Sequence, residues 1–145
     1  MPTYVFSTEL GRLTQSQRLD IVRSLTTIHA EETGAPRYLV QVVFHDVQAH
    51  SLYVGGEAAP AGQIWIRGDI RSGRTVAVKR RMIERILYDV CAATGSAEEE
   101  VWVYICDIPA DNIAEYGRVL PPPGDEAVWL TTLPGGLRTR LLSLG

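Results

Sequence analysis

The chain has 145 residues, of which 46% are hydrophobic and 21% charged, with a formal net charge of −3. This composition is typical of one ordinary globular domain, and the acidic balance argues against a nucleic-acid-binding surface, which needs a basic excess. Two cysteines, Cys91 and Cys106, are too few for a disulfide framework or a zinc cluster. No segment has the pattern of a signal peptide or the length of a membrane span, so we expect a cytoplasmic protein without a membrane or nucleic-acid partner.

The first half of the chain has the pattern strand, helix, strand. Residues 3–8 are strand-like, and residues 14–17 have the spacing of a capping box that begins a helix ending near Glu32. Residues 38–44 (YLVQVVF) are almost continuously apolar, which indicates a strand buried on both faces. A looser stretch with turn-forming glycines follows.

The same pattern then repeats. Residues 64–70 are strand-like, a second apolar helix stripe ends at Thr94-Gly95, and residues 101–108 (VWVYICDI) again indicate a buried strand. A shift of 61 residues places Thr33-Gly34 on Thr94-Gly95. A tandem β-α-β duplication is therefore expected.

From this repeat we predict one α/β (α+β) domain over residues 1–145, with halves at about 2–47 and 63–108 and a C-terminal arm at 109–145. Both helices would cover one face of a mainly parallel four-stranded sheet. The other face would be covered by assembly of subunits, so an oligomer is expected.

The repeat also serves as an internal comparison for unusual residues. His29 lies on the apolar stripe of the first helix, where the second helix has Val90, and Tyr104 stands where the first half has Val43. The alternative interpretations are a core histidine and a core aromatic whose hydroxyl finds a backbone partner.

Arg71 and Arg74 follow a predicted parallel strand and precede a helix. Ligands bind at this edge of open α/β sheets, and helix N-termini favour anions, so the two guanidiniums could hold a small carboxylate. The alternative is a solvated turn. The segment RSGR is too short for a phosphate-binding loop, so a nucleotide is not expected.

Pro2 and Glu115 complete the candidate residues. Removal of Met1 would leave Pro2 with a free secondary amine, and free α-amino groups titrate near pKa 7.7–8.0. Otherwise Pro2 is an unstructured second residue. Glu115 is expected on a single helical turn at residues 112–116, where it matters only if that segment folds back over the site.

Taken together, the motifs resemble the tautomerase superfamily, and within it the cis-3-chloroacrylic acid dehalogenase group. The stretches that carry the resemblance are MPTY, YLVQVVF, IRSGRT, EEVWVYI and AEYGR followed by LPPPG, from Met1 to about Leu133. The final residues, 134–145, are not placed by this resemblance. The resemblance implies a tautomerase-like fold, a homotrimer, and neither a metal nor an organic cofactor.

The resemblance also implies a role for each candidate residue. Pro2 would be the acid/base, and Arg71 and Arg74 would bind the substrate carboxylate. His29 would assist at the carboxylate or at the water. Tyr104 and Glu115 would activate the water.

The expected reactions are hydrolytic dehalogenation or hydration of cis-3-haloacrylate or acetylenic acids, together with keto–enol tautomerisation of a 2-oxo acid such as phenylpyruvate. Two alternatives stay open: a protein that is primarily a tautomerase, with the other activities promiscuous, and a carboxylate-binding β-α-β module without catalysis. The protonation state of Pro2 is also open, because nearby arginines would lower its pKa and Glu115 would raise it.

Overall fold

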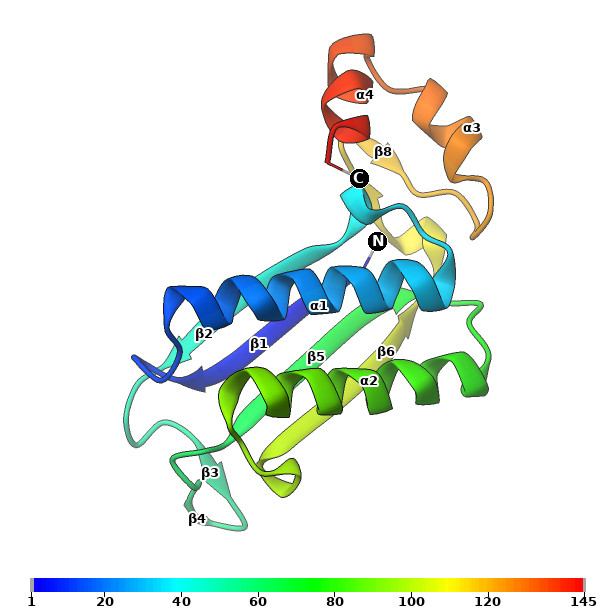
Figure 1. The fold of residues 1–145 in the computed structure, drawn as a ribbon. Coiled ribbons are helices and arrows are strands. Elements are labelled where there is room, and N and C mark those ends of the chain that lie inside the picture. The colour runs from blue at the N-terminus through cyan, green and yellow to red at the C-terminus, as the bar shows by residue number, and fades with distance from the viewer. Residues whose placement is uncertain (1, 145) are drawn as a thin grey trace.

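A four-stranded sheet with two long helices on one of its faces forms the body of the protein (Figure 1). The computed structural model describes residues 2–144. The strand order is β2-β1-β5-β6. These strands are β1 (Thr3–Glu9), β2 (Gln41–Val47), β5 (Ile64–Arg71) and β6 (Val101–Ile108).

The two halves of the chain meet in an antiparallel pairing. β1 runs parallel to β2 and β5 runs parallel to β6, whereas β1 and β5 are antiparallel, with Thr3 opposite Asp69. The start of β1 therefore lies beside the end of β5. This register places Pro2 next to the segment from which Arg71 emerges.

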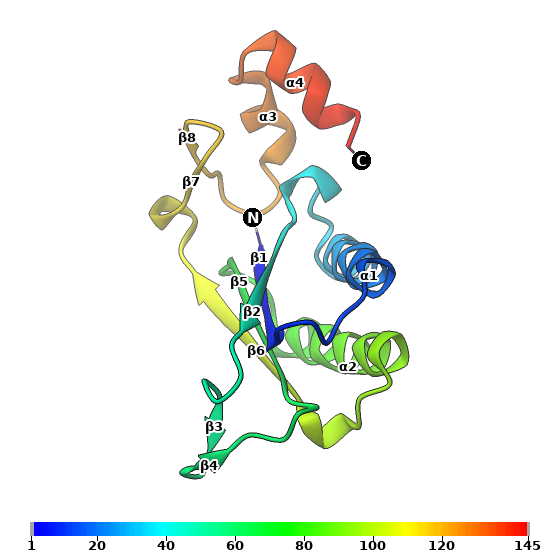
Figure 2. The same ribbon diagram turned by 90° about the vertical axis from the view of Figure 1, so that its left-hand side faces the viewer.

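The predicted duplication is confirmed in the helices. Helices α1 (Gln15–Thr33) and α2 (Val76–Thr94) both have 19 residues, and both begin after a capping threonine, Thr14 or Thr75. Both end at a glycine with φ 72°, a left-handed conformation that suits glycine best. The helices lie side by side on the same face of the sheet (Figure 2).

The core fills the space between this helix pair and the sheet. It consists of apolar side chains from both halves, chiefly Tyr4, Phe6, Ile21, Leu25, Ile28, Ile64, Ile66, Met82, Ile86 and Val90. The exposed sheet face, the one turned away from α1 and α2, has no such cover among residues 2–144. Trp102 and Tyr104 on this face have 39% and 48% of their surface exposed.

Two sequence predictions about strands are wrong. The apolar run 38–44 is not a single strand, because Arg37–Leu39 forms a 3₁₀ turn and β2 begins at Gln41. Nor are β2 and β6 buried on both faces, since they are the edges of the sheet and one face is uncovered. The apolar side chains of Tyr38 and Leu39 are instead buried in a second cluster.

That second cluster belongs to the C-terminal arm. After β6 come η3 (Ala110–Asn112), a hairpin of β7 (Ala114–Glu115) and β8 (Arg118–Val119), and helices α3 (Glu126–Thr131) and α4 (Gly135–Leu142). The cluster joins Tyr38 and Leu39 to Leu120, Trp129, Leu130, Leu133 and Leu141. The arm is thereby fixed against the segment that follows α1.

The predicted helical turn at 112–116 is also wrong. Tyr116 and Gly117 have φ of 51° and 78°, the two consecutive positive values that a tight hairpin turn requires. Glu115 is therefore on β7 rather than on a helix. Between Pro2 and Leu144, no helix has both the length and the apolar composition needed to cross a bilayer.

Candidate functional site

Several segments converge where β1 begins. The end of α1, the end of β5 and the start of the C-terminal arm surround the N-terminus, as Figures 1 and 2 both show. Pro2 is buried there, and its carbonyl accepts a hydrogen bond of 3.0 Å from the Gln41 amide. Pro2 is therefore not the unstructured second residue of the alternative interpretation, whereas the removal of Met1 concerns a residue outside the described range.

His29 faces this site from α1. Its side chain lies on the buried stripe with Leu25 and Ile28, and 3% of the residue is exposed. The Tyr4 hydroxyl lies 2.9 Å from its Nδ1. Burial above all, and then the positive charges of Arg74 and Arg71, lower the pKa of His29 from 6.5 to about 3. His29 is therefore neutral at pH 7, with both guanidiniums in its surroundings.

Arg71 is held rigidly at the end of β5. It is 3% exposed, and its Nη1 donates a 2.6 Å hydrogen bond to the Pro121 carbonyl. Its Nη2 donates to Oε1 of Glu126, the first residue of α3. The other carboxylate oxygen of Glu126 accepts from the Gly124 amide at 3.0 Å.

The charge of Glu126 is stabilised by these contacts. Burial acts to raise its pKa, but hydrogen bonds from Arg71 and from backbone amides outweigh burial and hold the pKa of Glu126 below its ordinary value. The C-terminal arm thus supplies a buried counter-ion to one of the two predicted carboxylate ligands. Sequence analysis missed Glu126 because its partner lies 55 residues away along the chain.

Arg74 differs from Arg71 in having unused hydrogen-bonding capacity. It is half-buried, and its Nε is buried without a hydrogen-bond acceptor among residues 2–144. Burial and then the like charge of Arg71 lower its pKa. A buried donor without a partner is costly, and two guanidiniums repel each other. An anion between Arg74 and Arg71 would relieve both conditions.

The fifth candidate residue, Glu115, lies on strand β7 of the β7–β8 hairpin. Burial raises the pKa of its carboxyl, while Arg71 acts in the opposite direction. The hydroxyl of Tyr116, the next residue, donates a 3.0 Å hydrogen bond to the Tyr38 carbonyl, so the β7–β8 hairpin folds back towards the site. The structure therefore brings together five candidate residues at the end of the sheet where β1 begins and β5 ends: Pro2, His29, Arg71, Arg74 and Glu115.

Tyr104 is not part of this group within one chain. It pairs with Arg67, which in turn pairs with Val5, so Tyr104 is two strands across and three residues along from Pro2. With ordinary strand spacings, this corresponds to roughly 14 Å between the two Cα atoms. Its ring lies on the exposed sheet face, edge-on to Trp65 at 5.8 Å between centroids.

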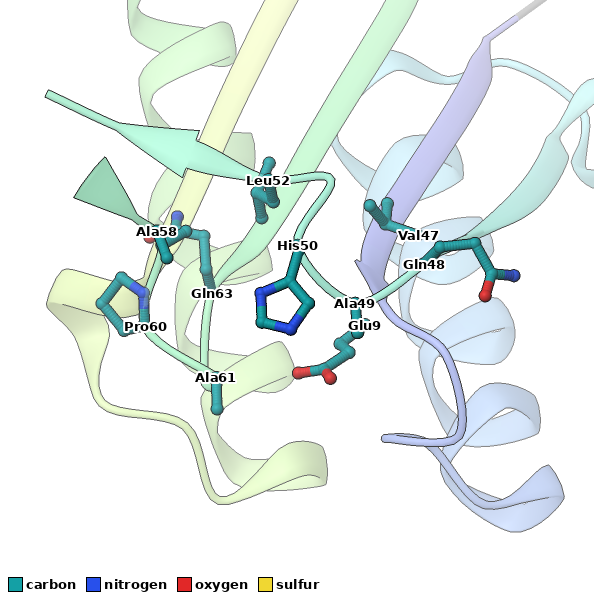
Figure 3. Close-up of a pocket in the computed structure, with 11 residues that line it drawn as sticks. Glu9, Val47, Gln48, Ala49, His50, Leu52, Ala58, Pro60, Ala61 and Gln63 are labelled. Atoms are coloured by element: carbon teal, nitrogen blue, oxygen red, sulfur yellow. The ribbon is translucent and has the colours of Figure 1, made fainter. Parts of the chain in front are cut away.

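Two hollows lie elsewhere on the molecule. Figure 3 shows a cavity of about 230 Å³ at the opposite end of the sheet, where Glu9 and His50 face each other across the β2–β5 connection. It contains none of the predicted site residues. A hollow of about 220 Å³ on the exposed sheet face is lined by Trp65, Trp102 and Tyr104. Among residues 2–144, no cluster of His, Cys, Asp or Glu is arranged to hold a metal ion.

Comparison with known proteins agrees with the resemblance in the motifs. The sequence profile of the family described as "Putative oxalocrotonate tautomerase enzyme" matches residues 1–132. A solved structure of N1, a member of the cis-3-chloroacrylic acid dehalogenase family, is 42% identical and has a TM-score of 0.93, covering 97% of this chain and 99% of that one. The chain belongs to the tautomerase superfamily and, within it, to the cis-3-chloroacrylic acid dehalogenase family.

Two further structures extend the comparison. Native Ps01740 is 35% identical, with a TM-score of 0.74, over 78% of this chain and 99% of that chain. The structure described as Q0 fused 4-OT wild type symmetric trimer is 23% identical with a TM-score of 0.74, over 81% of this chain and 94% of that chain, and shows a common fold. No curated protein matches the chain. The family identifies the chain as an enzyme of the tautomerase or dehalogenase type.

The neutral state of His29 predicts a pH dependence of stability. Its pKa is lower in the folded protein than in the unfolded chain, so its contribution is fully present above pH 6.5 and is lost as the pH falls towards 3. Relative to His29→Gln, the wild type should lose up to about 1.4 kcal/mol per pH unit in this window. Urea unfolding at several pH values measures the difference; exposed His45→Gln is the control, and parallel profiles for wild type and His29→Gln would contradict the assignment.

The Arg71–Glu126 pair predicts a second stability effect. Glu126→Ala leaves a buried guanidinium without its counter-ion, which should cost about 3–5 kcal/mol in the free energy of unfolding. Asp125→Asn removes a carboxylate one residue earlier that makes no capping bond to α3, and should change stability by less than about 0.5 kcal/mol. Equal effects of the two substitutions in urea unfolding would show that Arg71 does not depend on Glu126.

Proposed function

We propose that the protein, once Met1 is removed, is a cofactor-free enzyme that adds water to small α,β-unsaturated carboxylates. The reactions are dehalogenation of cis-3-haloacrylate and hydration of acetylenic acids, with keto–enol tautomerisation as a further activity. The observation that carries this proposal is the buried Nε of Arg74, which has no acceptor within residues 2–144 and lies in the field of Arg71. The family of N1 supports the same substrate class.

Binding of the substrate follows from the two guanidiniums. Arg74 offers an unused N–H edge, and Arg71 is held by Pro121 and Glu126 so that its remaining N–H groups have a fixed direction. A carboxylate clamped in this way withdraws electron density from the β-carbon of an unsaturated acid. The β-carbon then becomes the position that a nucleophile attacks.

The remaining residues divide the proton transfers. Glu115 removes a proton from water as the oxygen bonds to the β-carbon, and the protonated Pro2 amine delivers a proton to the α-carbon. From a 3-haloacrylate this addition gives a 3-halo-3-hydroxy acid, which loses hydrogen halide to form an aldehyde acid. From an acetylenic acid the same addition gives an enol that becomes the oxo acid. The raised pKa of Glu115 brings this carboxyl closer to the range useful for such transfers.

Tautomerisation uses the same site with Pro2 neutral. The amine then removes a proton from the carbon next to the carbonyl of a 2-oxo acid such as phenylpyruvate and returns it to the enolate oxygen, which gives the enol; the reverse reaction moves the proton from oxygen to carbon. The neighbouring arginines favour the neutral amine, whereas Glu115 favours the protonated one. The balance between them decides which activity is the main one.

The function of Tyr104 requires a second copy of the chain. Its phenol is far from Pro2 in the same chain and lies on the exposed sheet face with Trp65 and Trp102. In a homotrimer, supported by the symmetric trimer of the fused 4-OT with the same fold, this face would be covered by a neighbour. Tyr104 would then assist water activation in the neighbour's site.

The free thiols of Cys91 and Cys106 agree with a cytoplasmic enzyme.

Steady-state kinetics test the proposal with cis- and trans-3-chloroacrylate, propiolate and phenylpyruvate. The cis isomer and propiolate should be hydrated, and Pro2→Ala should lower kcat/KM about 10²- to 10⁴-fold, since it removes the secondary amine. Arg74→Ala should act mainly on KM, by roughly 10- to 100-fold, because it removes charge-assisted hydrogen bonds. Arg80→Ala, an exposed arginine on α2, is the matched control and should leave both constants unchanged.

Other outcomes separate the alternatives. Full activity of Pro2→Ala with every substrate would rule out the amine mechanism. Phenylpyruvate as the substrate with by far the highest kcat/KM would identify a tautomerase with promiscuous hydration. Carboxylate binding without turnover, kept in Pro2→Ala and lost in Arg74→Ala, would indicate a non-catalytic binding module.

A further inference from the structure

Tyr4 and His29 form a buried pair beneath the site. The Tyr4 side chain is fully buried, and its ring occupies the space left by Gly68, where an added Cβ would come within 2.6 Å of Tyr4 Cε1. The Tyr4 and His29 rings meet edge to face, with centroids 5.9 Å apart at 74°. The hydroxyl oxygen lies 2.9 Å from His29 Nδ1. This packing leaves the phenol little freedom to turn elsewhere.

The chemistry of the pair fixes which atom carries the proton. If Nδ1 were the donor, the Tyr4 oxygen would accept, and the phenol proton would be buried without a partner, because His29 is the one hydrogen-bond partner of this hydroxyl within residues 2–144. An unsatisfied buried proton is costly, so the arrangement in which Tyr4 donates and Nδ1 accepts is favoured. An imidazolium is disfavoured as well, by burial and by the positive charges of Arg74, in the β5–α2 connection, and Arg71, at the end of β5.

We propose that Tyr4 is a positioning residue that holds His29 as a neutral imidazole with its single proton on Nε2. The Nε2–H then points away from Tyr4, and no described side chain hydrogen-bonds to it. This N–H adds a neutral donor to the two cationic ligands Arg71 and Arg74. The ligand oxygen that it binds is an acceptor, either of a carboxylate or of a 2-oxo group.

This assignment deepens the proposed function and, for the role toward substrate, rests on it. His29 acts as a fixed hydrogen-bond donor and does not shuttle protons, because its Nδ1 is occupied by Tyr4 and its Nε2 already carries a proton. Proton transfer is then left to Pro2 and Glu115. Tyr4 contributes without touching the substrate, since its hydroxyl reaches only His29.

Nitrogen NMR of ¹⁵N-labelled protein tests the tautomer directly. The chain has three histidines, and His29→Asn identifies the signals of His29. In the wild type, His29 should show an unprotonated Nδ1 and a protonated Nε2, unchanged between about pH 5.5 and 8.5. In Tyr4→Phe, the His29 Nδ1 signal should shift and a second tautomer should appear.

Kinetics of Tyr4→Phe give an independent readout. The variant keeps the ring and its packing, so it should remain folded, and KM for the carboxylate substrate should rise roughly tenfold with a smaller change in kcat. Tyr88→Phe, which removes an exposed phenol on α2, should behave as wild type in both experiments.

Each failure has a distinct signature. A proton on Nδ1 in the wild type, protonation of His29 between about pH 5.5 and 8.5, or an unchanged His29 spectrum in Tyr4→Phe would overturn the assignment. The expected spectra in a protein that turns over none of the substrates would uphold the Tyr4–His29 tautomer and overturn the proposed function instead.

Discussion

The antiparallel register between β1 and β5 is the constraint on which the site depends. It is the one pairing in the described sheet that joins the two β-α-β halves, and it turns the start of the chain towards the end of β5. A parallel pairing of β1 with β5 would have placed Pro2 and Arg71 at opposite ends of the sheet. Because Thr3 is opposite Asp69, Pro2 at the start of β1 lies at the same end of the sheet as Arg71 and Arg74, which end and follow β5. The fold thus brings together groups that lie about 70 residues apart in sequence.

Two arginines, Arg71 and Arg74, give this end of the sheet its positive charge, and neighbouring groups compensate part of it. Glu126 compensates Arg71 from the C-terminal arm, and burial keeps His29 neutral although it lies beside both arginines. Of these two arginines, Arg74 is the one whose buried Nε has no acceptor within residues 2–144. The arm therefore takes part in the chemistry of the site as well as in packing against Tyr38 and Leu39.

Much of the fold could be predicted from local signals. Threonine caps and terminal glycines fixed the ends of α1 and α2, and β6 has the predicted bounds. The strand predicted at 38–44 was wrong at its start, because the apolar side chains of Tyr38 and Leu39 pack in the second cluster and do not belong to a strand. The hairpin at Glu115 was missed because Tyr116, which is not a glycine, adopts a positive φ. The bare sheet face followed from having only two helices for one sheet, but the apolar pattern of β2 and β6 could not show that these two are the edge strands.

The site was predictable where the duplication supplied a comparison. His29 stood out against Val90, and the arginines stood at a strand end, but the partners that hold them, Tyr4 and Glu126, were invisible because their contacts are long-range. The most direct measurement of the central idea is the imino nitrogen resonance of Pro2 in ¹⁵N-proline-labelled protein, recorded with increasing propionate. The account predicts a titratable amine whose resonance shifts with propionate in the wild type and not in Arg74→Ala. A protein that retains Met1, or a Pro2 resonance indifferent to the carboxylate, would contradict it.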